Sequence, residues 1–407
     1  MDPRKLKGLN TEKNNILELP FPYWWAFDGQ DQQQRESSSK KVILFLGNDM
    51  ATFTKAGTDA DTYVKKCNQC LDYIRMEFKD CEFYYKPHPA DKIERISLDL
   101  NGFEILEDQM SAELYLFKNY SRIRSVFSVG SAAAYSAYAM GIDAHVFYKC
   151  FRDIFDDEKI KPLDEFYYSM PPSFFITDLT EKPVNNSRLL KRDDLMETFF
   201  KSILADNTSD KVWLIVFTVE YTVLLIALSN LIRSIMPSKK VGLIISSHNY
   251  WTTLDSNDFK NNFDEIIMWP RIHYSLRPFK LWQAILTAIK IKRFNIPKDD
   301  LLISITQNSF VENCLNSYNK NNQRIGLISD KDFNLFYNSE NSVYKEDSNF
   351  RFNKASWFFN KILEPLLGLN RSLFMFYGKD GNSFISRYQK PVNEVFDKMV
   401  IMKADTI

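Results

Sequence analysis

Glycine is scarce in this chain, with 12 in 407 residues, and neither glycine-rich phosphate-binding pattern occurs. Without G-x-G-x-x-G there is no dinucleotide-binding fingerprint, and without G-x-x-x-x-G-K-[ST] there is no Walker loop. If the chain binds a phosphate, we therefore expect side chains and the N-terminus of a helix to hold it.

Histidine and cysteine are also few, at 4 and 5 residues. So small a set of histidines does not predict a metal site, and we expect neither a metal nor another cofactor. The motif Cys67-Asn68-Gln69-Cys70 has redox spacing but lies within a polar helical stretch, which favours a structural role. Scattered cysteines and an opening without a signal-peptide pattern indicate a reducing, cytoplasmic setting.

The chain has no excess of either charge, since Lys+Arg and Asp+Glu both number 52. A protein that holds nucleic acid through its overall field needs a positive excess, so we expect no nucleic-acid partner. The apolar stretch 212–232 does not predict a membrane span, because Glu220 lies at its middle, where a charge in lipid is costly. A buried strand followed by a helix explains the stretch better.

Hydrophobic residues make up 45% of the chain, and short apolar runs alternate with helical stretches. This alternation is typical of parallel sheets covered by helices on both faces. In the first half we expect strands at 41–46, 81–85, 125–128 and 144–148, and helices at 59–78, 111–120 and 132–140. In the second half we expect strands at 213–218, 240–246, 265–269, 300–305, 324–329 and 372–377, and helices at 221–235, 278–292, 309–318 and 354–367.

We therefore predict an α/β protein with two Rossmann-like domains facing a cleft, the nucleotide-binding domain first. The expected parts are a lead-in at residues 1–40, a donor-binding domain at 41–205 and an acceptor-side domain at 206–407. Ligands of open α/β sheets gather at the carboxyl ends of the strands, so residues that directly follow strands are the first site candidates.

Two such segments carry chemistry in the first half. The tetrapeptide KPHP at 86–89 closes a strand, and its prolines fix the backbone around His88, which suits a preorganised binding group. The turn SVGS at 128–131 opens the small-residue helix 132–140, whose N-terminus can receive a phosphate. Together the two segments predict one nucleotide site.

The letters YYKPHP at 84–89 and VFSVGSAAAYSAYAMG at 126–141 resemble the paired motifs of bacterial transferases that use CMP-activated sugars. These are the sialyltransferases, polysialyltransferases and Kdo transferases, with a His-Pro pair and a serine motif that bind CMP in one Rossmann-like lobe. The acceptor-binding lobe of these enzymes is similar to two further segments of this chain, WLIVFTVEYTVLLIALSNLI at 213–232 and QRIGLISDKDFNLFY at 323–337.

The resemblance implies that His88 contacts the donor phosphate and assists the departure of CMP. It implies that Ser128 and Ser131 bind the phosphate or cytidine, and that Glu113 holds the ribose or cytosine. Tight helix–strand packing is the alternative role for the serines, and simple solvation is the alternative for Lys86. The expected donor-binding residues are Asn48, Lys86, His88, Glu113, Ser128, Gly130 and Ser131.

In most such sialyltransferases the acceptor lobe comes first, whereas here the His-Pro and serine motifs precede the second lobe. The reversed order resembles the β-Kdo transferases of capsule and O-antigen synthesis. The implied function is transfer of a 2-keto-3-deoxy acid sugar, Kdo before sialic acid, from CMP to a bacterial surface glycan. A CDP-glycerol-type polyol-phosphate transferase, which also has a His-Pro and a serine motif, and a non-catalytic nucleotide- or glycan-binding module stay open as alternatives.

Such a transfer needs a carboxylate, as the nucleophile of a retaining enzyme or the general base of an inverting one. Glu220 is the first candidate, because a carboxylate within an apolar run is costly unless it is used, although a charge favoured by the dipole at a helix N-terminus explains it too. Asp330 and Asp332 follow the strand 324–329 and are its rivals, although a Ser-Asp-Lys-Asp turn explains them too. The segment 246–248 follows another strand and is expected to face the acceptor.

The segment 271–293 is basic and amphipathic, with Arg277, Lys280, Lys290, Lys292 and Arg293 among leucine, tryptophan and isoleucine. It predicts either an ordinary solvated helix face or peripheral contact with the inner face of the cytoplasmic membrane, where a glycolipid acceptor is presented.

Overall fold

The chain folds into two compact α/β units, each built on a parallel sheet. The computed structural model describes residues 16–27, 41–50, 58–89, 94–107, 110–217, 221–247, 257–305, 309–332, 350–352, 355, 358–369, 374–378, 384–387 and 395–404. The first unit comprises Phe21–Asp193, with Thr222–Ala227 and the last residues of the chain. The second comprises Asp194–Tyr221 and Leu228–Lys403, with the residues up to Pro20.

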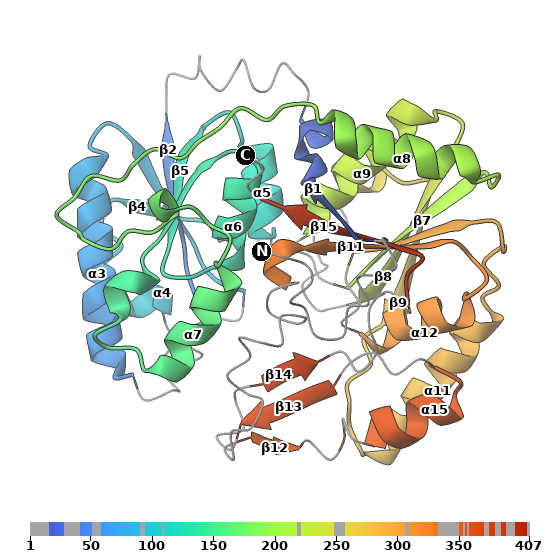
Figure 1. Cartoon of the computed structure of the whole chain (residues 1–407). Coiled ribbons are helices and arrows are strands. Elements are labelled where there is room, and N and C mark those ends of the chain that lie inside the picture. The colour runs from blue at the N-terminus through green and yellow to red at the C-terminus, as the bar shows by residue number, and fades with distance from the viewer. Residues whose placement is uncertain are drawn as a thin grey trace. The chain divides into compact units, whose positions relative to one another are not determined.

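The first unit has a five-stranded parallel sheet in the order β4-β3-β2-β5-β6. The strands are β2 (Val42–Leu46), β3 (Glu82–Lys86), β4 (Phe103–Ile105), β5 (Ile123–Ser128) and β6 (Asp143–Val146). Its helices are α3 (Ala60–Glu77), α4 (Glu94–Ser97), α5 (Ala112–Lys118), α6 (Ala132–Ala139) and α7 (Asp157–Phe166). Helix α3 lies on one face of the sheet, and α5 and α6 lie on the other (Figure 1).

Local sequence explains these elements. All five residues of β2 are buried, as is typical of a central parallel strand covered on both faces. In α3, Asp59 caps the N-terminus by accepting a hydrogen bond from the Thr62 N–H. Its buried face includes Cys67 and Cys70, and burial raises the pKa of both thiols, which agrees with a structural role.

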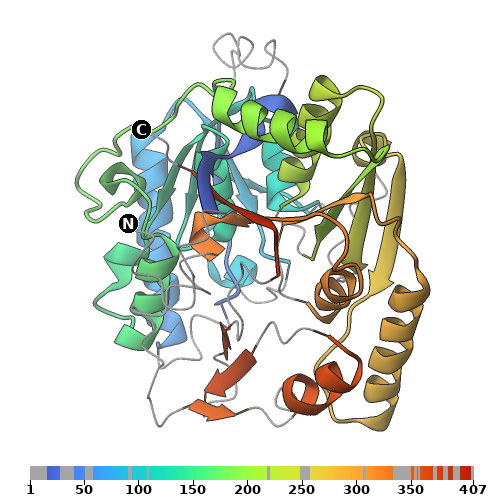
Figure 2. The same ribbon diagram turned by 45° about the vertical axis from the view of Figure 1, so that its right-hand side comes forward.

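The second unit has a seven-stranded parallel sheet in the order β1-β15-β11-β10-β7-β8-β9. The strands are β1 (Ile16–Pro20), β7 (Lys211–Val216), β8 (Lys240–Ser247), β9 (Glu265–Pro270), β10 (Leu301–Ser304), β11 (Arg324–Ser329) and β15 (Lys398–Lys403). Its larger helices are α8 (Asp194–Asp206), α11 (Pro278–Arg293), α12 (Phe310–Tyr318) and α9 (Thr222–Ile235), although the first turns of α9, Thr222–Ala227, are grouped with the first unit. Figures 1 and 2 show α11 and α12 together on one face of this sheet, opposite α9.

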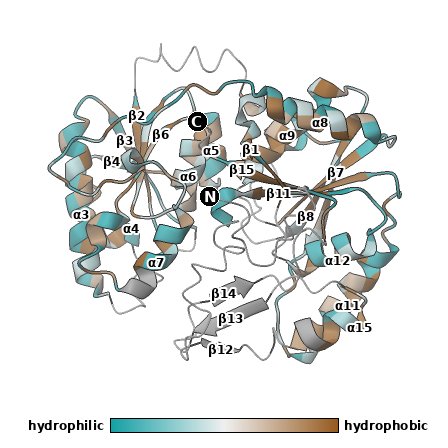
Figure 3. Cartoon of the chain, viewed as in Figure 1, coloured by the Kyte–Doolittle hydropathy of each residue, from teal (hydrophilic) through white to brown (hydrophobic). Residues whose placement is uncertain are grey.

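Both strand orders follow the doubly wound Rossmann pattern, in which the first strand is central and the order reverses beside it. The predicted fold class of two Rossmann-like α/β units is confirmed. Central strands such as β2 and β7 consist almost entirely of buried apolar residues, and many helices show both hydrophilic and hydrophobic colours (Figure 3). That distribution places one apolar core within each unit.

Several strands depart from the predicted pattern, and β4 and β15 lie where no strand was expected. Residues 16–20, expected in the lead-in, form edge strand β1, which pairs in parallel with β15. The strand expected at 372–377 is β13 (Phe374–Gly378), and it lies in a separate antiparallel sheet with β12 (Phe350–Phe352) and β14 (Phe384–Arg387). Within the described part of 354–367, helical turns cover Phe359–Leu366.

Candidate functional site

Three loops leave the carboxyl edge of the first sheet side by side. In the ladder Leu46 of β2 pairs with Lys86 of β3 on one side and with Ser128 of β5 on the other, so all three strands end at the same level. The strand order reverses between β2 and β5, which makes this edge the topological switch point of the sheet. Ligands of doubly wound folds bind in the crevice at this point.

The first of these loops carries His88. Its backbone leaves β3 through Pro87, and the histidine is half-buried between a half-buried and an exposed proline. The carbonyl of Lys86 accepts a 2.9 Å hydrogen bond from the N–H of Gly47, which ties the starts of the β3 and β2 loops together. The predicted histidine therefore lies at the carboxyl edge, separated from the serine turn by the single strand β2.

The serine turn is organised by its own hydroxyls. Ser128 is fully buried, and its Oγ accepts a 3.0 Å hydrogen bond from the N–H of Ser131. Ser131 is the N-cap of α6, with its Oγ accepting from the N–H of Ala133 at 3.3 Å. Gly130 and Ser131 are half-buried, so solvent reaches the turn there, whereas Ser128 supports it from within.

Lys86 and Glu113 lie deeper than the sequence suggested. Both are buried, and the Lys86 ammonium lies 5.7 Å from the ring centre of Tyr115, on the same helix as Glu113. Helix α5 begins at the cap Ser111, whose Oγ accepts from the N–H of Leu114. Both charged groups are therefore largely shielded from solvent.

Glu94 is the residue of this edge that the sequence did not reveal. It opens the short helix α4 and is fully buried, and its carboxylate accepts hydrogen bonds from three donors. The donors are the backbone N–H of Asn48 at 2.7 Å and the hydroxyls of Tyr85 at 2.8 Å and Tyr63 at 2.9 Å. One carboxylate thus joins α3, β3, α4 and the loop after β2.

The loop after β2 needs its glycine because of this network. A Cβ on Gly47 would lie 2.5 Å from the Tyr85 hydroxyl and 2.8 Å from a Glu94 carboxylate oxygen. The following residue, Asn48, is 3% exposed, and among the described residues its buried side-chain nitrogen has no hydrogen-bond partner. Buried amide groups are ordinarily satisfied, so this nitrogen is suited to a bound ligand or an ordered water.

Helix α7 and the residues after it cover the serine turn. The Tyr167 hydroxyl donates a 2.9 Å hydrogen bond to the carbonyl of Ser131, and the ring of Phe166 contacts Tyr135 of α6 edge-on. Two residues before Tyr167, Glu165 is half-buried, and burial raises its pKa from 4.5 to about 7. A half-buried carboxyl group whose pKa is raised toward neutrality is a further functional candidate that the sequence analysis missed.

Replacing Glu165 with glutamine should remove a pH dependence of stability. Between pH 4.5 and about 7 the folded chain holds a proton that the unfolded chain releases, so the free energy of unfolding falls as pH rises through this window. At pH 8 we expect the variant to be more stable by on the order of 1 kcal/mol, a figure reduced for partial exposure. Urea unfolding at several pH values measures this, with Glu104→Gln on exposed β4 as control. Equal pH dependence in wild type and variant would contradict the shifted pKa.

The second sheet has its own switch point, between β7 and β10. Glu220, the first predicted catalytic carboxylate, follows β7 there but lies outside the described residues, as does His248 after β8. Ser246, at the end of β8, is 1% exposed, and its Oγ has no hydrogen-bond partner among the described residues. The sequence therefore places polar groups at this edge too.

Asp330 and Asp332 lie in a buried polar cluster after β11. The Asp332 carboxylate accepts hydrogen bonds from the hydroxyls of Tyr221 and Ser329 and pairs with the ammonium of Lys331 at 3.2 Å. Asp330 accepts from the N–H of Lys331 at 2.9 Å and is 4% exposed. Asp332 thereby links Tyr221, the N-cap of α9, to Ser329 at the end of β11.

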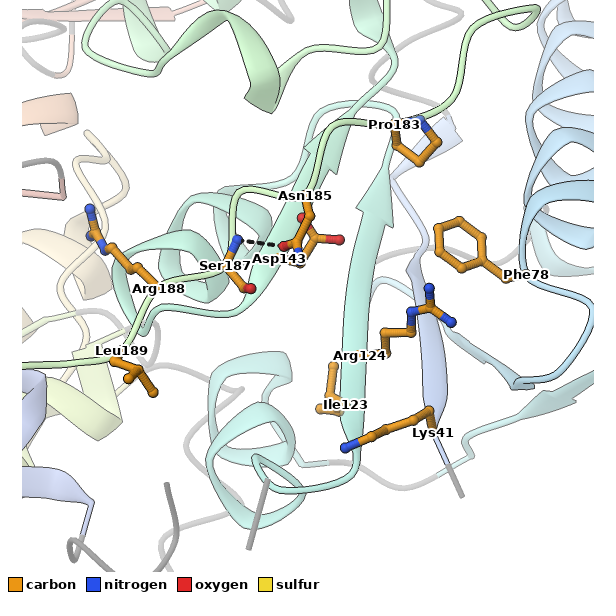
Figure 4. A pocket seen from close by; sticks show the side chains of 10 residues that line it. All are labelled: Lys41, Phe78, Ile123, Arg124, Asp143, Pro183, Asn185, Ser187, Arg188 and Leu189. Atoms are coloured by element: carbon orange, nitrogen blue, oxygen red, sulfur yellow. Dashed lines mark hydrogen bonds between the residues drawn. The ribbon is translucent and has the colours of Figure 1, made fainter. Parts of the chain in front are cut away.

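A hollow of about 360 Å³ opens at the opposite, amino edge of the first sheet (Figure 4). Its wall includes Lys41, Arg124 and Asp143, which precede or begin strands β2, β5 and β6. Burial would raise the pKa of Asp143, but hydrogen bonds from His145, the Asn186 N–H and Ser125 hold it below its usual value. These bonds serve the fold, and the edge is not where doubly wound sheets bind ligands.

Within the described residues no group of three or more His, Cys, Asp and Glu side chains is arranged to hold a metal ion. None of the described helices is both long and apolar enough to cross a bilayer.

No protein-family model matches the chain, and no curated protein matches it by sequence. Among solved structures, the wall teichoic acid polymerase TagF, in a variant soaked with CDPG, is similar at 10% identity and a TM-score of 0.15. That likeness covers 73% of this chain and 75% of the polymerase chain. Because so low a score does not establish a shared fold, neither the fold nor the function of this chain rests on it.

Proposed function

We propose that this chain is a glycosyltransferase that takes Kdo from a CMP-activated donor and transfers it to a bacterial surface glycan at the inner face of the cytoplasmic membrane. What supports the proposal most is the switch point of the first sheet. There the histidine loop, the loop of Asn48 and the serine turn at the start of α6 leave three adjacent strands at one level. A helix N-terminus and a histidine at a switch point are suited to a phosphate monoester.

The donor-side chemistry follows from these groups. Departure of CMP leaves an oxocarbenium-like centre on the sugar and places negative charge on the leaving phosphate. In the proposed mechanism His88 donates a hydrogen bond or a proton to that phosphate, and the N-terminus of α6 stabilises its charge. Gly130 and Ser131 supply the solvent-accessible part of that terminus. These groups act without a metal.

The distances between strands fit a nucleotide. Neighbouring strands are about 4.8 Å apart, so the β3 and β5 loops, which flank β2, are separated by roughly 10 Å. That span accommodates a phosphate and its ribose between the two loops. The proposed contact for the nucleotide between them is the buried side-chain nitrogen of Asn48, which lacks a partner among the described residues.

The proposed carboxylate comes from the second unit, with Glu220 preferred because it directly follows β7 at that sheet's switch point. Two hydroxyls and the Lys331 ammonium already contact the Asp332 carboxylate, which suits it to a structural role more than to accepting a substrate proton. We propose that Asp332 stabilises the loop after β11 and that Asp330 is the alternative to Glu220 as the general base.

The donor is tested by incubating the purified chain separately with CMP-Kdo, CMP-sialic acid and CDP-glycerol and measuring the nucleotide released. We expect CMP release from CMP-Kdo, faster than from CMP-sialic acid, and none from CDP-glycerol. Turnover of CDP-glycerol alone would replace the proposal with a polyol-phosphate transferase. Tight CMP binding without turnover of any donor, even with a glycan acceptor added, would indicate a non-catalytic module.

A further inference from the structure

Helix α11 carries two apolar faces, and only one of them is used by the fold. Its inner face, with Ala284, Ala288 and Ile291, packs in the core of the second unit against β7, β8, β10 and α12. Its outer face exposes Phe279 by 74%, Trp282 by 58%, Leu286 by 38% and Ile289 by 37%. Spacings of three and four residues put these four side chains on one stripe of the helix.

A stripe of this kind is unusual on a soluble surface. Scattered exposed apolar side chains need no explanation, but a contiguous row that includes phenylalanine and tryptophan marks an interaction surface. Because the inner face of the same helix is already buried, the outer stripe adds nothing to the core. It needs another occupant.

The charges around the stripe indicate what that occupant is. Helix α11 contains no acidic residue, and the other residues exposed along it are Pro278, Lys290, Lys292 and Arg293. At 3.6 residues per turn, Lys290 and Arg293 fall on the same side as Leu286 and Ile289 and continue the stripe. The exposed surface of the helix is therefore apolar and cationic throughout.

The residues before the helix extend the positive field. Arg277 is exposed at the N-cap of α11, and Leu276 beside it is 45% exposed. Partial burial lowers the pKa of the nearby His273, and the neighbouring cations Arg271 and Lys280 lower it further. A protein partner offers such a surface acidic side chains in particular places, whereas an anionic lipid surface offers charge and an apolar layer over its whole area.

We propose that the outer face of α11 docks on an anionic phospholipid membrane, with Phe279, Trp282, Leu286 and Ile289 entering the interface and Lys290 and Arg293 meeting lipid phosphates. Tryptophan and phenylalanine favour the boundary between headgroups and acyl chains. Each basic residue near such a surface adds attraction that salt screens. The helix lies in the plane of the membrane and does not cross it.

Vesicle cosedimentation of the full chain tests the proposal. We expect binding to phosphatidylglycerol–phosphatidylethanolamine vesicles at low salt, weaker binding at high salt, and little binding to phosphatidylcholine alone. The double variant Phe279→Ser/Trp282→Ser should lower the affinity about tenfold or more. The double variant Lys290→Glu/Arg293→Glu should do the same and flatten the salt dependence. All four side chains are exposed, so the variants should fold, which circular dichroism checks.

Matched controls come from ordinary exposed positions. Leu195→Ser on α8, where the leucine is 66% exposed beside acidic residues, and Lys65→Glu on α3 should both bind vesicles like the wild type. A wild-type chain that stays in the supernatant, or apolar-stripe variants that bind like it, would overturn the proposal. The proposal would also be overturned if Trp282→Ser changed the oligomeric state and left vesicle binding unaltered. In that case a second copy of the chain, and not a membrane, would cover the outer face of α11.

This docking goes beyond the proposed donor chemistry and fails separately from it. Vesicle binding needs no nucleotide, so His88→Ala should bind vesicles normally even where it releases no CMP.

Discussion

Replacing His88 with alanine is expected to lower the rate of CMP release from the donor by about a hundredfold or more, with little loss of stability. General acid assistance by a positioned side chain contributes about that much to a rate. The histidine is half-buried in a loop whose backbone is held by prolines, so its truncation leaves the sheet intact. Donor hydrolysis followed by chromatography of the released nucleotide measures the effect.

The matched control is His273→Ala, because His273 is exposed in the second unit, before α11. It should release CMP at the wild-type rate. If His88→Ala retains full activity, or if both variants lose activity equally, the histidine loop is not the donor site. If His88→Ala binds CMP as tightly as the wild type but releases it from the donor more slowly, His88 acts on the leaving phosphate. If the affinity for CMP and the rate of release fall by the same factor, His88 has a binding role.

Replacing Glu94 with alanine is expected to cause the largest loss of stability in the first unit, about 3 kcal/mol or more. The substitution leaves the Asn48 N–H and two tyrosine hydroxyls buried without the carboxylate that accepts from them. It also releases the loop after β2, so CMP affinity should fall with stability. Urea unfolding followed by circular dichroism gives the first quantity and calorimetric titration with CMP the second.

Two further variants distinguish the loss of the Glu94 hydrogen bonds from the general effect of removing a negative charge. Glu104→Ala removes an exposed glutamate from β4 and should change the free energy of unfolding by less than about 0.5 kcal/mol. Gly47→Ala adds a Cβ against the same carboxylate and the Tyr85 hydroxyl, so it should act like Glu94→Ala but more weakly. A Glu94→Ala variant as stable as Glu104→Ala would show that the buried carboxylate does not hold this loop.

The sequence was sufficient for most of the fold because its signals are local. The apolar run of β2 and the capped, periodic α3 are each specified by consecutive residues. Strand β1 was not predictable, because five residues at one end of the chain pair with β15 near the other, and nothing local announces the partner. The pairing of β12 with β13 was missed for the same reason, since it connects residues more than twenty positions apart, such as Phe352 with Phe376.

The residues of the candidate site also fall into those that the local sequence predicts and those that only the fold brings together. His88 and Ser131 could be proposed because proline and a serine turn mark strand ends in the sequence itself. Glu94 could not, because its partners Tyr63 and Asn48 lie 31 and 46 residues away and its helix has only four residues. The sequence showed that α11 is basic and amphipathic, but only the packing reveals which apolar face is buried.

We propose that one cytidylate binds where the β2, β3 and β5 loops leave the first sheet. Hydrogen–deuterium exchange with and without CMP can detect such binding, because each loop yields its own peptides. We predict slower exchange at residues 47–50, 86–89 and 129–134 on adding CMP, and no change around the hollow of Figure 4 at the opposite edge. Protection confined to that hollow, or none at these three loops, would contradict the account.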